Sequence, residues 1–195
     1  FAYGSTGSVV SVSNLVSSSG VVAADVTGVG TARASLGAAP YGGDKGIFAF
    51  GSGRTNISNL VSNSGVVSSN VDGVGTSRDQ MAGAGFGVGK AIFGFGNDGS
   101  VTGVTNLVSA SGVVAADVSA VGTARRWISA CSYGGDKGIF AYGKPANDTA
   151  GTLSNLVSNT GVVASNVSGV GTAREGAAAT SFGSGGKGIF AYGKN

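Results

Sequence analysis

The chain has 195 residues, of which 11% are charged, 42% are hydrophobic and 38 are glycine, and its net charge is +3. The hydrophobic content is too high for a disordered chain, and the glycines do not follow the every-third-residue period of collagen. The basic residues are not clustered, which argues against a nucleic-acid surface, and no apolar run reaches the roughly 18 to 20 residues of a membrane-spanning helix. We therefore expect one soluble globular domain with a hydrophobic core.

One block of sequence recurs along the whole chain. The motifs FAYG, SNLVS, GVV, GVGTAR and YGGDKGI follow one another, with small variations, in repeats 1–47, 48–92, 93–139 and 140–189, and a partial fifth copy covers 190–195. The arginine that ends GVGTAR, here called the repeat arginine, falls at Arg33, Arg78, Arg125 and Arg174. A repeat of this length predicts stacked or radially arranged supersecondary units, so residues 1–195 are interpreted as a single repeat domain.

Each repeat contains four segments with strand character. The segment KGIFAYG is continuously apolar, which predicts a strand buried on both faces. SNLVS and the segment that begins at GVV flank a glycine-ended turn, such as SNSG at 62–65, and so predict a hairpin. The segment after the repeat arginine is rich in Ala and Gly, as an innermost strand near a crowded axis requires. No window shows the apolar period of a helix, so we expect an all-β fold.

Four antiparallel strands in about 47 residues match one blade of a β-propeller, for which roughly 40 to 50 residues is typical. The order of Arg, small-residue strand, IFAYG, loop, NLVSNTGVV and GVGTAR resembles the kelch repeat, although valines such as Val21 and Val22 replace its last-strand Trp. The resemblance implies a kelch-like β-propeller of about four blades, interpreted as part of a larger propeller, with a closed four-bladed ring as the alternative. The near-identical sequences of the repeats are also similar to those of tandem-repeat proteins of marine tailed phages.

The residue types exclude much of enzyme chemistry. The chain has no histidine and one cysteine, Cys131, so it lacks the usual general base, the commonest metal ligand and a thiolate zinc site. We expect no enzymatic activity, no cofactor and no bound metal. An Asp or Asn, here called the repeat Asx, recurs at one position, as Asp25, Asn70, Asp117 and Asn166. Exchange of Asp for Asn favours hydrogen bonding to backbone over a ring of calcium ligands. The repeat arginines are expected to bind carbonyls or carboxylates of the scaffold rather than to form an anion channel.

The repeats diverge in two zones. The first directly follows the repeat arginine, and its candidate binding residues are Asp79, Gln80, Met81, Arg126, Trp127, Ile128 and Glu175. The second is the loop after FAYG, and its candidates are Arg54, Asn97, Asp98, Lys144 and Asp148. Turns of a four-stranded antiparallel blade alternate between its two ends, so we expect both zones on one face. Variable loops on a uniform scaffold are typical of a recognition surface, with Trp127 beside Arg126 as the anchor.

The sequence thus favours a non-catalytic binding or structural module, exposed on a phage virion or a cell surface, that recognises glycan or protein through these loops. We expect an extracellular or virion-associated location, no nucleic-acid partner, no membrane insertion, and a place in an oligomer or larger assembly. Two alternatives remain open. One is an intracellular kelch-type protein-interaction propeller, and the other is an architectural filament or decoration subunit in which the variable loops have no role.

Overall fold

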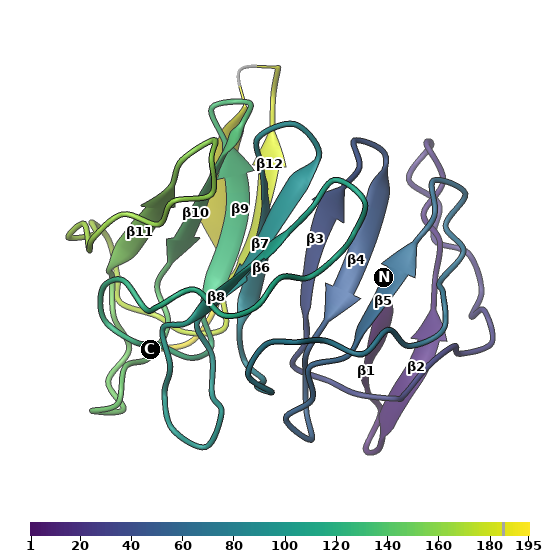
Figure 1. The fold of residues 1–195 in the computed structure, drawn as a ribbon, viewed down its shortest axis with the longest axis horizontal. Helices are drawn as coiled ribbons and strands as arrows, with labels where there is room; N and C mark the ends of the chain where they lie inside the picture. Colours follow the sequence, from purple (N-terminus) through teal and green to yellow (C-terminus); the bar gives the residue numbers. More distant parts are fainter. Residues whose placement is uncertain (185) are drawn as a thin grey trace.

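The computed structural model describes residues 1–184 and 186–195, which form thirteen β-strands and no helix (Figure 1). The prediction of an all-β fold is confirmed. Within the described residues, no helix is long and apolar enough to cross a membrane.

The strands form five small antiparallel sheets, one after another along the chain. The sheets are β1 (Ala2–Ser5) with β2 (Val9–Ser13); β3 (Gly37–Tyr41), β4 (Lys45–Ala49) and β5 (Ser58–Val61); β6 (Ala82–Phe86), β7 (Lys90–Gly94) and β8 (Thr105–Val108); β9 (Ser129–Tyr133), β10 (Lys137–Ala141) and β11 (Ser154–Val157); and β12 (Ala178–Phe182) with β13 (Lys187–Ala191). In Figure 1 the first sheet (purple) lies at the right, and the later repeats follow to its left.

A complete sheet has three strands, so the expectation of four strands per repeat is wrong. Across the described residues, the fourth segment forms no continuous ladder with the third strand, and it pairs with it at isolated bridges such as Ser58 to Val71 and Val61 to Val67. Between these bridges one backbone hydrogen bond remains, from the Ser68 N–H to the Leu60 carbonyl at 2.8 Å. The Asn59 Nδ2 donates to the Ser68 carbonyl at 3.0 Å, so a side chain occupies a backbone acceptor of the fourth segment.

The small-residue strands β3, β6, β9 and β12 pack against one another in chain order. Together they line a shared cavity of about 270 Å³, to which each contributes, for example through Ala38, Ala84, Cys131 and Thr180. Glycine allows this close approach, because a Cβ at Gly83 would lie 2.8 Å from the Ala38 carbonyl oxygen. The strand after each repeat arginine is therefore the inner strand of its sheet. The first and last sheets do not close into a ring in the described part of the chain.

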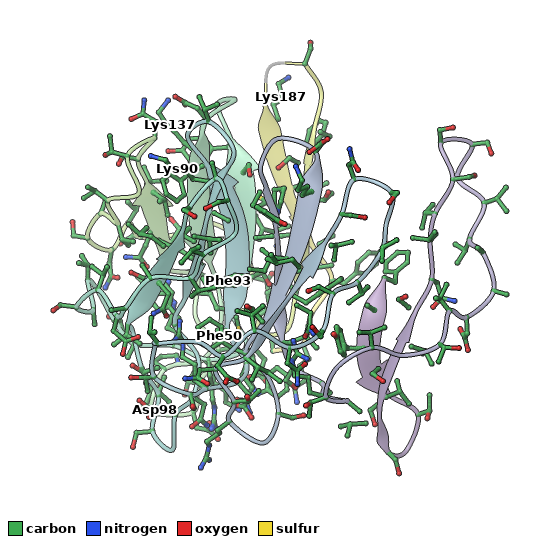
Figure 2. The ribbon with its side chains drawn as sticks, turned by 45° about the vertical axis from the view of Figure 1, so that its right-hand side comes forward. Phe50, Lys90, Phe93, Asp98, Lys137 and Lys187 are labelled. Carbon is green, nitrogen blue, oxygen red and sulfur yellow. The ribbon has the colours of Figure 1, made fainter. Side chains whose placement is uncertain are left out.

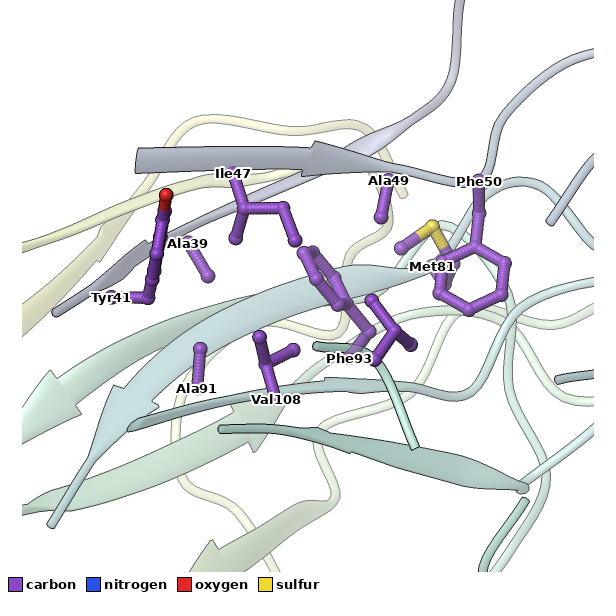
Figure 3. Packing of buried hydrophobic residues seen from close by; sticks show 10 residues of the cluster. Ala39, Tyr41, Ile47, Ala49, Phe50, Met81, Ala91, Phe93 and Val108 are labelled. Atoms are coloured by element: carbon purple, nitrogen blue, oxygen red, sulfur yellow. The ribbon is translucent and has the colours of Figure 1, made fainter. Parts of the chain in front are cut away.

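Aromatic residues join each sheet to the next (Figure 3). Phe50 follows β4 with a φ of 61°, which turns its ring toward Phe93 of the next sheet at a centroid distance of 5.8 Å. Phe95 repeats this contact with Phe140 at 5.1 Å. These edge-to-face pairs are fully buried, and they make the core a series of equivalent layers between neighbouring sheets.

Three repeat arginines, Arg33, Arg78 and Arg125, are buried in the same layers, Arg174 is half-buried, and all four bind scaffold carbonyls, as the sequence predicts. Arg78 lies over the Phe50 ring at 4.1 Å, and its Nε donates to the Phe95 carbonyl at 2.9 Å. Its Nη2 donates to Asn106 Oδ1 at 2.6 Å. Burial lowers the pKa of Arg78 to about 10, so the side chain stays charged at neutral pH. The ring face and the three oxygen acceptors, which include the Thr76 carbonyl, compensate this buried charge.

The repeat Asx ties neighbouring repeats together. Asp117 Oδ1 accepts hydrogen bonds from Asn106 Nδ2 at 2.8 Å and from the backbone N–H of Thr76, in the preceding repeat, at 3.0 Å. Asn70 accepts in the same way from the Thr31 N–H at 3.1 Å. Hydrogen bonding of this side chain to backbone is thus confirmed, across repeats rather than locally. Among the described residues no three side chains of His, Cys, Asp or Glu gather in a way that could hold a metal ion.

Candidate functional site

The zone after each repeat arginine lies beside the FAYG loop of the next repeat. Asp79 and Asn97 exchange backbone hydrogen bonds of 3.0 and 2.9 Å, and Arg126 and Lys144 exchange hydrogen bonds of 2.9 and 2.8 Å. We call the surface formed by both zones the variable face; it comprises residues 34–36, 52–57, 79–81, 97–104, 126–128, 144–153 and 175–177. Figure 2 shows Asp98 of this face at one end of the molecule and the repeat lysines Lys90, Lys137 and Lys187 at the other.

A backbone relay runs across the variable face from repeat to repeat. The Gln80 N–H donates to the Ser35 carbonyl at 2.9 Å, the Trp127 N–H donates to the Gln80 carbonyl at 2.9 Å, and the Gly176 N–H donates to the Trp127 carbonyl at 2.8 Å. These are the second residues after the four repeat arginines. Their φ angles are 52°, 58°, 51° and 61°, so all four occupy the left-handed region. The relay fixes one conformation at a position where the side chain differs in every repeat.

The left-handed conformation costs a residue other than glycine roughly 1 to 2 kcal/mol. Three of the four relay residues, Ser35, Gln80 and Trp127, bear that cost. Strain that the surrounding structure maintains is characteristic of functional sites. The relay therefore fixes the backbone of Trp127 in the same conformation as that of Ser35 and Gln80.

Trp127 is 39% exposed and borders two cavities. One, of about 360 Å³, is lined by Trp127, Glu175, Gly176, Gly193 and Lys194. The other, of about 220 Å³, has Trp127 and Gln80 at its wall and Met81 and Ile128 among its lining residues. Met81 and Ile128 are also buried members of the two core clusters. Their side chains therefore line this cavity and also pack the core.

Two charged residues, Glu175 and Lys194, line the larger cavity, and ion pairs connect them to charged residues nearby. Arg126 binds Asp148 at 2.6 Å, and Lys144 lies between Asp148 at 3.5 Å and Glu175 at 3.6 Å. Lys194 holds the other oxygen of Glu175 at 3.2 Å. The hydrogen bond from Arg126 lowers the pKa of Asp148, which keeps this carboxylate ionised. Glu175 is buried, and its Oε2 accepts no hydrogen bond from the described residues.

The remaining candidates lie where the second and third repeats meet. Burial raises the pKa of the Asp79 carboxyl, and the positive charge of Arg54 opposes this rise. Asn97 is buried, and its Oδ1 accepts a hydrogen bond from the Gly99 N–H at 2.8 Å, so it shapes its own turn. Asp98 and Arg54 are exposed at the rim of the variable face. The candidates thus fall into a group around Trp127 and a second group around Asp79.

Sequence reasoning missed Lys194 and the shared conformation of the relay. Lys194 follows FAYG in the partial fifth copy as Lys144 does in the fourth repeat, so its place beside Glu175 was readable from the alignment of the repeats. Gly176 was also a signal, because glycine at the position of Trp127 is consistent with a positive φ.

Comparison with protein-family models finds no family that matches this chain, and comparison with curated proteins finds no match either. The case for function therefore depends on the geometry of the variable face.

Proposed function

We propose that this chain is a non-catalytic recognition module that binds a neutral glycan on the variable face, against the Trp127 ring. The observation that carries the proposal is the relay, which holds Trp127 in a left-handed conformation between two cavities. The cavity of about 360 Å³ is within the roughly 300 to 1,000 Å³ of small-ligand sites.

The side chains around Trp127 suit the chemistry of a sugar. A sugar ring has apolar C–H faces, for which the flat indole offers a large apolar surface, and hydroxyl groups at its rim. Lys144, Lys194 and Arg126 can donate hydrogen bonds to such hydroxyls.

The charges of the variable face and its cavity rim balance, which favours a neutral ligand over an ionic one. Four carboxylates stand against four cations: Asp79, Asp98, Asp148 and Glu175 against Arg54, Arg126, Lys144 and Lys194. An acidic or basic ligand would meet like charges as well as opposite ones, whereas a neutral sugar would meet donors and acceptors of both kinds.

We further propose that the scaffold is a kelch-like β-propeller. Two observations support this proposal. The four inner strands line one cavity, and the same aromatic contact joins neighbouring sheets in successive repeats. The low fraction of charged residues and the many glycines favour an exposed appendage, such as a phage virion or cell-surface protein, as its setting.

An array of neutral oligosaccharides tests the proposed function. The unaltered chain is expected to bind a subset of the sugars, and Trp127→Ala is expected to abolish that binding. Lys90→Ala, at the opposite end of the molecule, serves as the control and should bind as the unaltered chain does. Binding that survives Trp127→Ala, or the absence of any bound sugar, would contradict the proposal and favour the architectural alternative.

A further inference from the structure

The smaller cavity beside Trp127, here called the relay cavity, is lined by equivalent positions of all four repeats. Its volume is about 220 Å³. The second residue after each repeat arginine contributes to the lining, namely Ser35, Gln80, Trp127 and Gly176. Because the relay gives these four residues the same backbone conformation, their side chains start from equivalent places of one frame. The relay cavity therefore combines a regular backbone with a different side chain from each repeat.

The third residue after each repeat arginine makes the rest of the lining apolar. These residues are Leu36, Met81, Ile128 and Ala177. Met81 and Ile128 are buried members of the two core clusters, so the packing of the sheets holds this wall in place. An apolar wall offers no hydrogen-bond partner to a buried hydroxyl group, but it accommodates a methyl group.

Gln80 and Ser35 bring polar groups to the lining of the relay cavity. The Oε1 of Gln80 is buried and accepts no hydrogen bond from the described part of the chain. Rotation of the carboxamide exchanges its oxygen and its nitrogen, so Gln80 can accept a hydrogen bond from an N–H or donate one to a carbonyl. The Ser35 hydroxyl can also donate or accept. Because a buried polar group without a partner is costly, the ligand group that fits here has both amide polarity and an apolar end.

We propose that the glycan bound at Trp127 carries an acetamido group that enters the relay cavity, and that Gln80 is the residue that determines this specificity. The inference rests on the proposed function and adds the class of sugar to it. The acetamido methyl contacts the apolar wall, while its N–H and carbonyl pair with the Gln80 carboxamide and the Ser35 hydroxyl. Trp127 lines the relay cavity as well as the larger one, so a sugar ring against the indole brings a substituent to this place. Gly176 adds no side chain to the cavity, which leaves room for the group.

Matched pairs of neutral oligosaccharides test the proposal. Oligomers of N-acetylglucosamine and glucose, or of N-acetylgalactosamine and galactose, are compared by calorimetry in pairs that differ only in the group at carbon 2. The unaltered chain is expected to bind the acetamido member of at least one pair at least tenfold more tightly than the hydroxyl member. The reason is that a site built to hydrogen-bond a ligand group discriminates against the analogue that lacks it.

Gln80→Met tests the role of the carboxamide, because it removes the amide and keeps the length of the side chain. The affinity for the acetamido sugar should fall at least tenfold, while the affinity for its hydroxyl counterpart should change less than twofold. A general disturbance of the fold would lower both affinities, and circular dichroism checks that the variant folds. Asn159→Leu is the matched control. It removes an exposed amide that donates to Asp136 at 3.0 Å, beside Lys137 at the opposite end of the molecule (Figure 2), and it should keep the full preference.

The outcomes separate this inference from the proposed function. Equal affinity for both members of every pair that binds, or a preference that Gln80→Met retains, would overturn the inference and leave the proposed function intact. If no neutral sugar binds, the proposed function and the inference fail together.

Discussion

Replacing Arg78 with alanine removes the side chain that connects two neighbouring sheets at the centre of the molecule. The substitution leaves two buried oxygens without their donor, the Phe95 carbonyl and the Oδ1 of Asn106, and a partly buried one, the Thr76 carbonyl. It also empties a fully buried space beside the Phe50 ring. An orphaned buried acceptor costs roughly 1 to 3 kcal/mol, and the cavity left by the side chain adds to this cost, so we expect a loss of about 4 kcal/mol in the free energy of unfolding.

The repeats provide a graded series for this prediction. Arg125 makes the same three hydrogen bonds as Arg78, whereas Arg33 makes only two, from Nε and Nη1. Arg174, beside the last sheet, makes one hydrogen bond of 3.3 Å, to the carbonyl of Phe190. Arg33→Ala should therefore cost about 1 kcal/mol less than Arg78→Ala, and Arg174→Ala should cost least.

Urea unfolding followed by circular dichroism measures these differences. Arg126→Ala is the control, because this neighbouring arginine forms a surface ion pair with Asp148, and such pairs contribute little to stability. Equal losses for all four repeat arginines, or the greatest loss for Arg174→Ala, would refute the reasoning.

Three further predictions concern the relay, the repeat Asx and the ligand. Trp127→Gly should be more stable than Trp127→Ala by about 1 kcal/mol in urea unfolding, because glycine tolerates the left-handed conformation; equal stability would argue against strain at this residue. Burial opposes ionisation of the Asp117 carboxyl, but hydrogen bonds from Thr76 and Asn106 outweigh burial and lower its pKa. The ionised group therefore stabilises the fold above the unfolded-state pKa of about 3.9. This stabilisation is lost as the pH falls through the lower pKa of the folded state. Asp117→Asn, which has the residue that repeats two and four carry, should accordingly lose less thermal stability between about pH 5 and pH 2 than the unaltered chain, and parallel losses would count against the assignment. The affinity for a neutral glycan should change less than about twofold between roughly 50 and 500 mM salt, whereas a steep fall would indicate an ionic ligand.

Much of the architecture could be predicted from the repeats. Apolar runs such as Lys45–Ala49 and small-residue segments such as Ala82–Phe86 form strands, because their patterns match the burial of a middle strand and the crowding of an inner one. The sequence predicts a fourth strand in each repeat, and the described residues form none there. Valine favours a strand by propensity, but the Asn59 side chain competes for the backbone at Ser68, and that tertiary hydrogen bond outweighs the propensity.

The candidate site could be predicted only in part from the sequence. Variation among the repeats indicated the positions around Trp127 and Asp79, because the shared residues already account for the scaffold. Variation does not distinguish a side chain that faces solvent from one that packs below it, which is why Met81 and Ile128 were grouped with their exposed neighbours. The relay depends on hydrogen bonds between residues about 45 positions apart, so no local pattern could reveal it.

The central claim is that Trp127 contacts the ligand, and the fluorescence of this residue tests it most directly. Trp127 is the one tryptophan of the chain, so intrinsic emission reports on this site alone. Titration with a neutral oligosaccharide that binds on the array should give a saturable blue shift of the emission, with the same dissociation constant as calorimetry. Binding measured by calorimetry without any change in emission would show that the sugar binds elsewhere and would contradict the account.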